Sequence, residues 1–431
     1  MVDGRVMNRW LVVLGAILIQ LCLGAIYAWS VFTPALTKAP YNFTATQTQW
    51  IFGVGLAVFA IVMIVAGRMQ AKFPPRNVAM AGGVVLGLGY VAASFMGTSF
   101  LGHLICLGVI GGSGIGLGYV VPIAVGVKWF PDKKGMLTGL AVAGFGFGAL
   151  LWVKLAGSWG NLIESFGIAN VFLMYGIAFA AIVLVGSTWM VNPPAGWKPE
   201  GWEPPAPSPG NVASGAINLS SSEMLRTPQF YMLWAMFAAG AMAGLMVIGC
   251  ITLFGIDALR STGLTEVTAQ ARAGTAFGLF FALANGLGRI GWGIISDKIG
   301  RKASLFTMFL IQGTILLLFY QMGFNAWTLY LGSAVIGFNF GGNFALFPAA
   351  TADCFGNKQV GTNYGWVFTS YGVGGIVGPV LGGHFRDVAK SAADLGGGQI
   401  DPSAWSTPFI IAGVACLVAA ALALALRSPK A

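Results

Sequence analysis

Long apolar runs separated by short polar segments dominate the pattern of this chain. Each run has roughly the 20 residues that a helix needs to cross a bilayer, and none alternates as the strands of a β-barrel do. The runs occupy residues 10–36, 46–66, 78–97, 100–125, 136–158, 169–190, 228–256, 271–295, 303–323, 327–350, 361–383 and 406–426. The pattern therefore predicts an all-α membrane protein with twelve transmembrane helices.

A polar segment divides these runs into two sets of six. Residues 191–227 begin with NPPAGWKPEGWEPPAPSPG, whose prolines and glycines cannot continue a helix. We therefore expect a six-helix bundle over residues 1–190, a cytoplasmic linker over 191–227, and a second six-helix bundle over 228–431. The segments after the second and eighth runs, GRMQAKFPPR and GIISDKIGRK, echo each other. Such a repeat is typical of a secondary transporter with its site between two bundles.

Composition narrows the function further. Hydrophobic residues make up 57% of the chain and charged residues 8%, and its 64 glycines indicate helices that pack closely in lipid. The five cysteines have no paired spacing and there are two histidines, so we expect no disulfide and no metal site. No pair of carboxylates lies at membrane depth, and the glycine-rich strings follow no strand. We expect neither an enzyme nor a cofactor.

The basic residues indicate how the chain crosses the membrane. The net charge is +10, and most of the 23 lysines and arginines fall on one side when both termini are placed inside. This bias predicts cytoplasmic termini in a multi-pass protein of the cell (inner) membrane. Because the charges are dispersed over short loops, they favour contact with membrane lipid and argue against nucleic-acid binding.

Arg289 is the most informative residue, because it carries a charge inside an apolar run. Its guanidinium stays protonated at membrane depth, where an unpaired charge is costly. No Asp or Glu lies within two turns on its outward side, so we expect a substrate anion as its partner. Asn285, one turn earlier, could orient it. The alternative is that Arg289 snorkels towards Asp297, about 12 Å further along the helix.

A loop motif follows this run and carries a resemblance. Residues 293–302 contain the pattern G-x-x-x-D-K-x-G-R-K, formed by Gly293, Asp297, Lys298, Gly300, Arg301 and Lys302. It resembles the loop motif of the major facilitator superfamily, whose Asp and Arg can link helix ends on the cytoplasmic side. The first-half copy is degraded, because Ala71 stands where the Asp is expected.

Further segments resemble one family within that superfamily. These are WFPDKKG at residues 129–135, LTGLAVAG at 137–144, EMLRTPQF at 223–230, and the Asn-Tyr-Gly of residues 363–365. They are similar to the oxalate/formate antiporters and the monocarboxylate transporters, and in particular to bacterial homologues of the latter. Over both halves, the resemblance implies a twelve-helix fold and the transport of carboxylates.

The resemblance also assigns candidate binding residues. It places the family's span-eight arginine on Arg289 and two binding tyrosines on Tyr27 and Tyr119, while Tyr371 stands where the oxalate antiporter has a lysine. The positions of its aromatic cage are Phe145, Phe340, Phe344 and Phe368. One cation in an apolar cage suits a monoanion, because a second carboxylate would stay unpaired in a low dielectric. The alternative for each aromatic residue is ordinary helix packing.

Two residues are candidates for proton coupling. Asp257 lies three positions before Arg260 and could pair with it, and His384 titrates near neutral pH when unperturbed. The simpler alternatives are a surface ion pair and a surface histidine.

These observations predict a monomeric transporter of small monocarboxylates of the lactate or pyruvate type, coupled to protons as a symporter that works by alternating access. One alternative is an exchanger of the oxalate/formate type. An alternative of another class is a carboxylate sensor that does not transport.

Overall fold

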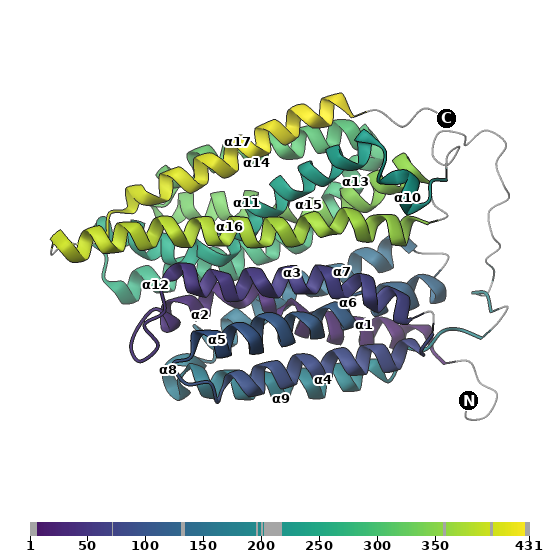
Figure 1. The fold of residues 1–431 in the computed structure, drawn as a ribbon, viewed down its shortest axis with the longest axis horizontal. Coiled ribbons are helices and arrows are strands. Elements are labelled where there is room, and N and C mark those ends of the chain that lie inside the picture. Colours follow the sequence, from purple (N-terminus) through teal and green to yellow (C-terminus); the bar gives the residue numbers. More distant parts are fainter. Residues whose placement is uncertain are drawn as a thin grey trace.

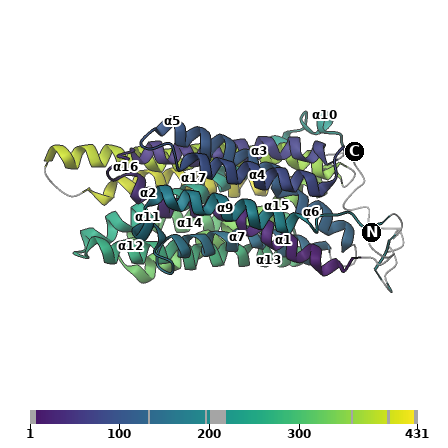
Figure 2. The same cartoon turned by 90° about the horizontal axis from the view of Figure 1, so that it is seen from below.

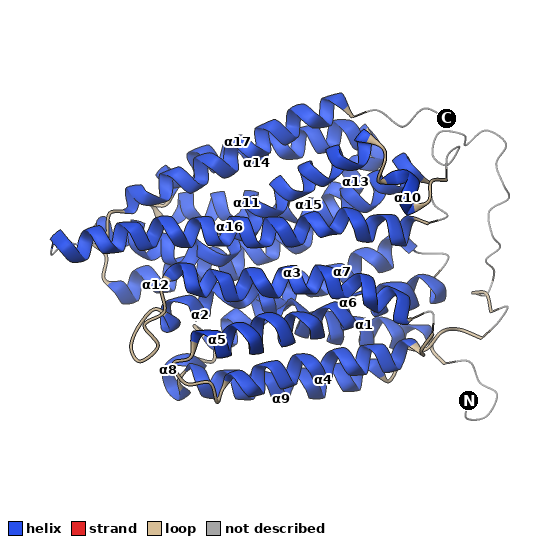
Figure 3. Ribbon diagram, in the orientation of Figure 1, coloured by secondary structure: helices blue, strands red, loops and turns tan. Residues whose placement is uncertain are grey.

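The structure, a computed structural model, describes residues 7–70, 72–130, 134–194, 197–199, 201, 218–356, 359–396 and 400–426. Throughout these ranges the regular structure is helical and no strand occurs (Figure 3). Parts of three predicted features lie outside the described residues, namely Ala71 of the degraded motif, residues 131–133 of the WFPDKKG segment, and most of the linker 191–227.

The first half of the chain builds six spans, some from more than one element. Its elements are α1 (Arg9–Leu23), η1 (Gly24–Ala28), α2 (Trp29–Leu36), α3 (Ala45–Met69), α4 (Pro75–Ala93), α5 (Phe100–His103), η2 (Leu104–Gly111), α6 (Gly112–Trp129), α7 (Lys134–Ala156), α8 (Leu162–Phe166) and α9 (Ile168–Ser187). The first span joins α1, η1 and α2, and the fourth joins α5, η2 and α6.

The second half follows the same plan. Its elements are α10 (Ser221–Met224), α11 (Pro228–Ser261), α12 (Glu266–Thr275), η3 (Ala276–Phe281), α13 (Ala282–Ile299), α14 (Arg301–Met322), α15 (Ala326–Phe355), α16 (Val360–Gly396), η4 (Pro402–Trp405) and α17 (Ser406–Ala425). The eighth span joins α12, η3 and α13. Here η2 and η3 are π-helical, a geometry that is frequent at functional sites.

Local sequence fixes the helix ends that matter most for function. α3 begins with a capping box, in which the Thr44 hydroxyl accepts from the Gln47 backbone N–H and the Gln47 side chain accepts from the Thr44 N–H. α13 ends at Ile299 and is followed by Gly300, whose φ of 83° lies in the region that favours glycine. Arg301 then begins α14, so a single residue turns the chain from the eighth span into the ninth.

Hydropathy identifies most of these spans. Among the described helices, nine are long and apolar enough to cross a membrane, and a shorter apolar stretch covers Ala143–Ala156 within α7. α15 and α16 have 30 and 37 residues but fall outside this group, because their glycine, asparagine and other polar residues lower the mean hydropathy. Together with α7, these two helices complete the twelve spans.

The helices lie side by side in two groups. Helices α1 to α9 occupy one side of the molecule and α11 to α17 the other (Figure 1), and Figure 2 shows the same bundle from below. The groups meet mainly where α3 packs along α16 and α7 packs against α13. We call the end at which α1 begins and α17 ends the terminal end, and the end at which α2 ends and α12 begins the distal end.

Glycine lets α3 and α16 approach closely. A Cβ atom on Gly53 of α3 would lie 2.9 Å from the carbonyl oxygen of Gly375, and one on Gly372 of α16 would lie 3.2 Å from the Cα of Ala57. The first distance is shorter than real Cβ atoms show and the second is tighter than most Cβ contacts, so a side chain at either position would force neighbouring atoms to shift. The close packing expected from the glycine content is therefore found at the interface between the two groups.

Candidate functional site

Arg289 lies on α13 and is buried, with 4% of its surface exposed. Its Nε donates to Oδ1 of Asn285, one turn earlier, at 3.3 Å. The Cζ atom of the guanidinium lies 4.0 Å from the ring centroid of Phe344 and 5.9 Å from that of Phe145. A cation over an aromatic face is stabilised by the ring quadrupole. Arg289 therefore points into the molecule and not towards Asp297, so the snorkelling alternative is not what the structure shows.

Two hydrogen-bond donors at this site, one on Arg289 and one on Asn285, have no partner in the protein. The NH1 atom of Arg289 is buried without a hydrogen-bond partner, and so is Nδ2 of Asn285. Among the residues that the structure describes, no carboxylate forms an ion pair with Arg289. A buried donor without a partner costs free energy, and two of them beside a permanent positive charge make a site for an anion.

The four candidate cage phenylalanines come from both halves, and two of them, Phe344 and Phe145, lie next to the cation. Phe340 and Phe344 come from α15, with ring centroids 5.3 Å apart. Phe145 of α7 contributes the second ring near the guanidinium, and Phe368 of α16 lies 6.4 Å from Phe344. All four are part of the buried core or packed against it. The lining of the site is therefore largely apolar apart from Arg289, Asn285 and a few hydroxyl groups.

Two tyrosines form a bridge between the halves. The hydroxyl groups of Tyr27, in η1, and Tyr371, on α16, share a hydrogen bond of 2.7 Å. The Tyr27 ring also lies 5.0 Å from Phe145 and 5.8 Å from Phe340. Tyr371 therefore takes part in a contact across the centre of the molecule, at the position where the resemblance expected a lysine.

Tyr119 completes the cluster from α6. Its ring lies 5.4 Å from Phe145 and 6.5 Å from Phe368. Its phenol and that of Tyr27 are both close enough to Arg289 to interact with the positive charge. The nine candidate binding residues, which are separated by up to 344 positions in the sequence, thus form one connected cluster at the centre of the bundle.

Sequence reasoning missed three residues of this cluster. The Phe59 ring on α3 lies 5.1 Å from Tyr119 and 5.9 Å from Tyr371. Tyr364 on α16 lies 5.6 Å from Phe368 and also interacts with the charge of Arg289. Gln20 on α1 donates to the carbonyl of Tyr119 at 3.1 Å. A buried glutamine in an apolar run was a usable signal for Gln20, but nothing in the sequence separates Phe59 from packing aromatics.

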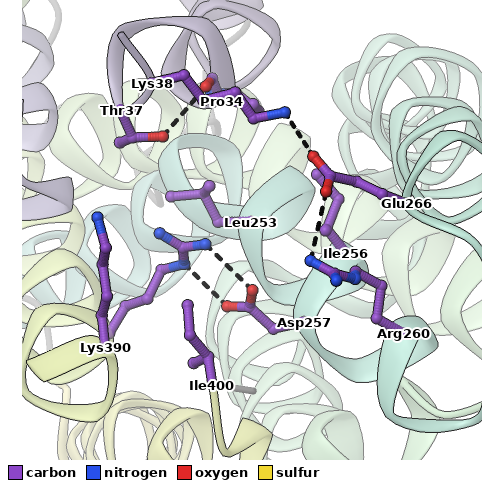
Figure 4. Close-up of a pocket in the computed structure, with 11 residues that line it drawn as sticks. Pro34, Thr37, Lys38, Leu253, Ile256, Asp257, Arg260, Glu266, Lys390 and Ile400 are labelled. Atoms are coloured by element: carbon purple, nitrogen blue, oxygen red, sulfur yellow. Dashed lines mark hydrogen bonds and ion pairs between the residues drawn. The ribbon is translucent and has the colours of Figure 1, made fainter. Parts of the chain in front are cut away.

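Asp257 does not pair with Arg260, contrary to prediction. Its carboxylate instead accepts from Nε and NH2 of Arg386 at 2.8 and 3.1 Å, and from Nε1 of Trp405 at 3.0 Å. Arg260 pairs with Glu266 at 3.4 Å (Figure 4). Asp257 lies on α11 and Arg386 on α16, so spacing along a single helix could not predict that they would meet. The other proton-coupling candidate, His384, is exposed near the distal end of α16.

Comparison with known proteins establishes the family. A sequence profile described as Major Facilitator Superfamily matches residues 17–283 and 260–431. The chain belongs to the major facilitator superfamily. Its all-α architecture with twelve transmembrane helices in two six-helix bundles is the fold of this superfamily, as predicted, and the protein is a membrane transporter and not an enzyme.

Relatives of this superfamily member include proteins named for carboxylates. It is 32% identical over 373 residues to the uncharacterized MFS-type transporter YhjX of Escherichia coli (strain K12), and the match covers 86% of each of the two chains. It is 28% identical to the oxalate:formate antiporter of Oxalobacter formigenes, over 97% of this chain and 92% of the relative. It is 25% identical to apicoplast pyruvate carrier 1 of Toxoplasma gondii, over 84% of this chain and 81% of the relative.

A solved structure supports the same fold. The bacterial homolog of the human lysosomal transporter Spinster, in an inward-facing and unoccupied conformation, superposes with a TM-score of 0.70 at 15% identity. The match covers 97% of this superfamily member and 96% of that chain. At this level of identity the likeness concerns the fold.

The loop motif of this superfamily member joins three helices at the terminal end. NH1 of Arg301 lies 2.9 Å from Asp297, and its Nε lies 3.4 Å from Asp353 at the end of α15. Arg301 also donates to the hydroxyl of Ser296. Gly300 supplies the positive φ of the turn, and a Cβ on Gly293 would lie 3.9 Å from that of Ala345. All these contacts are within the second half.

Proposed function

We propose that this transporter carries small monocarboxylates of the lactate or pyruvate type and couples their movement to protons as a symporter. The observation that carries the proposal is the pair of unused donors, Arg289 NH1 and Asn285 Nδ2, inside an aromatic cluster. A carboxylate accepts from such donors through charge-assisted hydrogen bonds. Similarity to the oxalate:formate antiporter and the pyruvate carrier supports the same class of substrate.

The charge balance of the cluster favours a monoanion. Arg289 is the cation there among the described residues, and the ring and hydroxyl groups around it are neutral. One carboxylate would neutralise the guanidinium and leave no net charge. A second carboxylate would have to enter the same apolar surroundings without a partner, which is costly.

Charge neutralisation also offers a mechanism for alternating access. The cluster includes side chains from both halves, with Arg289, Phe340 and Tyr371 from the second and Tyr27, Tyr119 and Phe145 from the first. When the anion pairs with Arg289 and reaches Tyr119, it connects the halves and removes the cost of occluding a free cation. The loaded transporter can then rock between its two open states. Asp257 and His384 remain the candidates for the proton, together with the substrate carboxylate.

The basic residues support a placement in the cell (inner) membrane with both termini in the cytoplasm. The terminal end would then face the cytoplasm and the distal end the outside. A monomer contains all the residues of the central cluster, so we propose that one copy transports on its own.

Uptake by purified protein in liposomes tests the assignment. With an inward proton gradient, we expect saturable uptake of radiolabelled lactate that Arg289→Ala abolishes, because the variant has no cation to pair with the carboxylate. Arg272→Ala is the matched control, since it removes an exposed arginine from the start of the same span. Saturable uptake by Arg289→Ala would contradict the assigned site.

Exchange of the oxalate/formate type is the second candidate, favoured by similarity to an antiporter over almost the whole chain. Uptake without a pH gradient, measured in empty and in preloaded liposomes, distinguishes symport from exchange. Net uptake into empty liposomes supports symport, whereas uptake that occurs only into liposomes preloaded with a carboxylate supports exchange. Competition by oxalate and formate in the same assay then ranks the substrates.

A further inference from the structure

Asp387 makes an unusual contact across the two halves at the distal end. It lies on α16 of the second half, and its two carboxylate oxygens accept from the backbone N–H groups of Ala45 and Thr46, each at 2.7 Å. These N–H groups belong to the first turn of α3 in the first half, where helical N–H groups have no partner within the helix. The positive end of the α3 dipole adds to the attraction for a carboxylate.

The close approach depends on Gly383, one turn before Asp387. A Cβ atom on Gly383 would lie 2.9 Å from the Cα of Thr46 and 3.0 Å from the carbonyl carbon of Ala45. Any side chain there would push α16 away from the first turn of α3. Gly383 and Asp387 therefore form one docking surface for the start of α3.

α3 does not need Asp387 in order to begin as a helix. Thr44 and Gln47 already form a complete capping box within the first half. The contacts of Asp387 are additional, and they exist only while the two halves are together at this end. They therefore stabilise a relative position of the halves more than they stabilise the helix.

An ion pair also crosses the interface between the halves at this end. Lys38, just after α2, donates to Glu266 at the start of α12, and Arg260 of α11 supports the same carboxylate (Figure 4). Between these groups lies a cavity of about 300 Å³ lined by residues of both halves. Polar contacts around a space are easier to separate than a continuous apolar interface, because water can replace each partner.

We propose that Asp387, Gly383 and the first turn of α3 form a distal latch that holds this end of the transporter shut. When the halves separate at this end, Asp387 leaves α3, and α3 keeps its own cap. The Lys38–Glu266 pair opens with it. The latch thus sets how often the central cluster is reached from the distal end, whichever substrate is carried.

Cysteine labelling tests the latch without any substrate. Thr252 on α11 is 3% exposed and lines a second cavity of about 530 Å³ at the distal end, together with α2 residues such as Val31 and Pro34. We would introduce Thr252→Cys and measure its reaction rate with a hydrophilic maleimide on purified protein in detergent. All five native cysteines are buried, and protein without the new cysteine provides the blank.

We expect Asp387→Asn to raise the labelling rate about tenfold or more, because the neutral amide keeps the shape but loses the charge and one acceptor. Asp394→Asn is the matched control, since this exposed carboxylate on the same helix makes no hydrogen bond or ion pair with any described residue. Its labelling rate should equal that of the parent. Equal rates for the parent and Asp387→Asn would overturn the proposal, as would an equal rise for Asp394→Asn.

A steric variant gives an independent test if Asp387→Asn does not fold. Gly383→Ala keeps the carboxylate but forces α16 away from α3, so it should raise the labelling rate as well. A parent-like rate in folded Gly383→Ala would count against the latch. Because labelling requires no carboxylate substrate, its outcome is independent of the uptake assay for Arg289→Ala.

Discussion

At the scale of single residues, the chemistry of the site depends on what holds Arg289. A neutral amide, Asn285, orients the guanidinium, and aromatic faces surround it. A carboxylate in the place of Asn285 would have held the arginine more strongly but would also have cancelled its charge. Asn285 thus keeps the cation oriented without neutralising it, so under the proposed function the charge stays free for a substrate carboxylate.

Asn285→Asp tests this reasoning directly. The new carboxylate would lie where Oδ1 of Asn285 already accepts from Arg289 at 3.3 Å, so it should neutralise the guanidinium and reduce lactate uptake more than tenfold. Asn285→Ala is the matched control, because it removes the orienting bond but leaves the charge free. It should mainly raise the KM. Uptake by Asn285→Asp equal to or above that of Asn285→Ala would show that a free charge is not required.

The residues of this cluster differ in how far the sequence could reveal them. Arg289 follows from physics alone, because a lone cation in an apolar run needs a partner, and Asn285 follows from helix spacing. The tyrosines and phenylalanines required the family resemblance, since aromatic residues in membrane helices usually pack. The pairing of Asp257 was predicted wrongly because Arg260 is near in sequence, whereas Arg386 comes close only through the packing of α11 against α16.

At the scale of helices, glycine decides how near α13 can come to α15. A Cβ on Gly288 would lie 2.0 Å from the carbonyl oxygen of Phe338 and 2.8 Å from its Cα. Gly341 has the same role from the other side, where a Cβ would lie 2.2 Å from the carbonyl oxygen of Asn285. These contacts bring α15, with Phe340 and Phe344, close to Arg289, so the helix spacing also sets the dimensions of the site.

Gly288→Ala should therefore destabilise the protein. The added methyl group meets backbone that cannot rotate away, and overpacking of this kind costs about 1–3 kcal/mol. Gly293→Ala, on the same helix, is the matched control because the nearest atom to its Cβ would be 3.9 Å away. We expect a lower unfolding temperature in detergent for Gly288→Ala and an almost unchanged one for Gly293→Ala. Equal unfolding temperatures would mean that the two helices can separate at little cost.

The apolar pattern predicts the existence of helices better than their ends. It ends the eleventh span at residue 383, whereas α16 continues to Gly396. The additional turns contain Arg386, Asp387 and Lys390, whose charges lower the hydropathy although they remain helical. Part of this extension carries the latch carboxylate and the partner of Asp257. The contacts at the distal end therefore could not be predicted from hydrophobicity alone.

At the scale of the whole molecule, two kinds of ion pair lie close together at the distal end and have different consequences. Asp257 and Arg386 are both in the second half, with side chains 5% and 11% exposed. Lys38 and Glu266 belong to different halves, with side chains 61% and 40% exposed. In a transporter that rocks as proposed, we expect a pair within one half to persist in every state and a pair between halves to form only when this end is closed. We expect the Asp257–Arg386 pair to contribute to the stability of the fold, and the Lys38–Glu266 pair to the equilibrium between the open and closed states of the distal end.

This distinction predicts opposite results for two variants. Asp257→Asn leaves the Arg386 cation buried without its partner, so it should lower stability by about 3 kcal/mol, with no change in the labelling rate of Thr252→Cys well below the unfolding temperature. Glu266→Gln removes an exposed pair worth less than about 1 kcal/mol, so the unfolding temperature should hardly change, while labelling accelerates as the distal end opens. If both variants changed stability and labelling together, the two halves would not move as separate bodies at this end. Alternating access by rocking would then need a different interface, because a transporter whose closing contacts also hold its fold together could not open without partly unfolding.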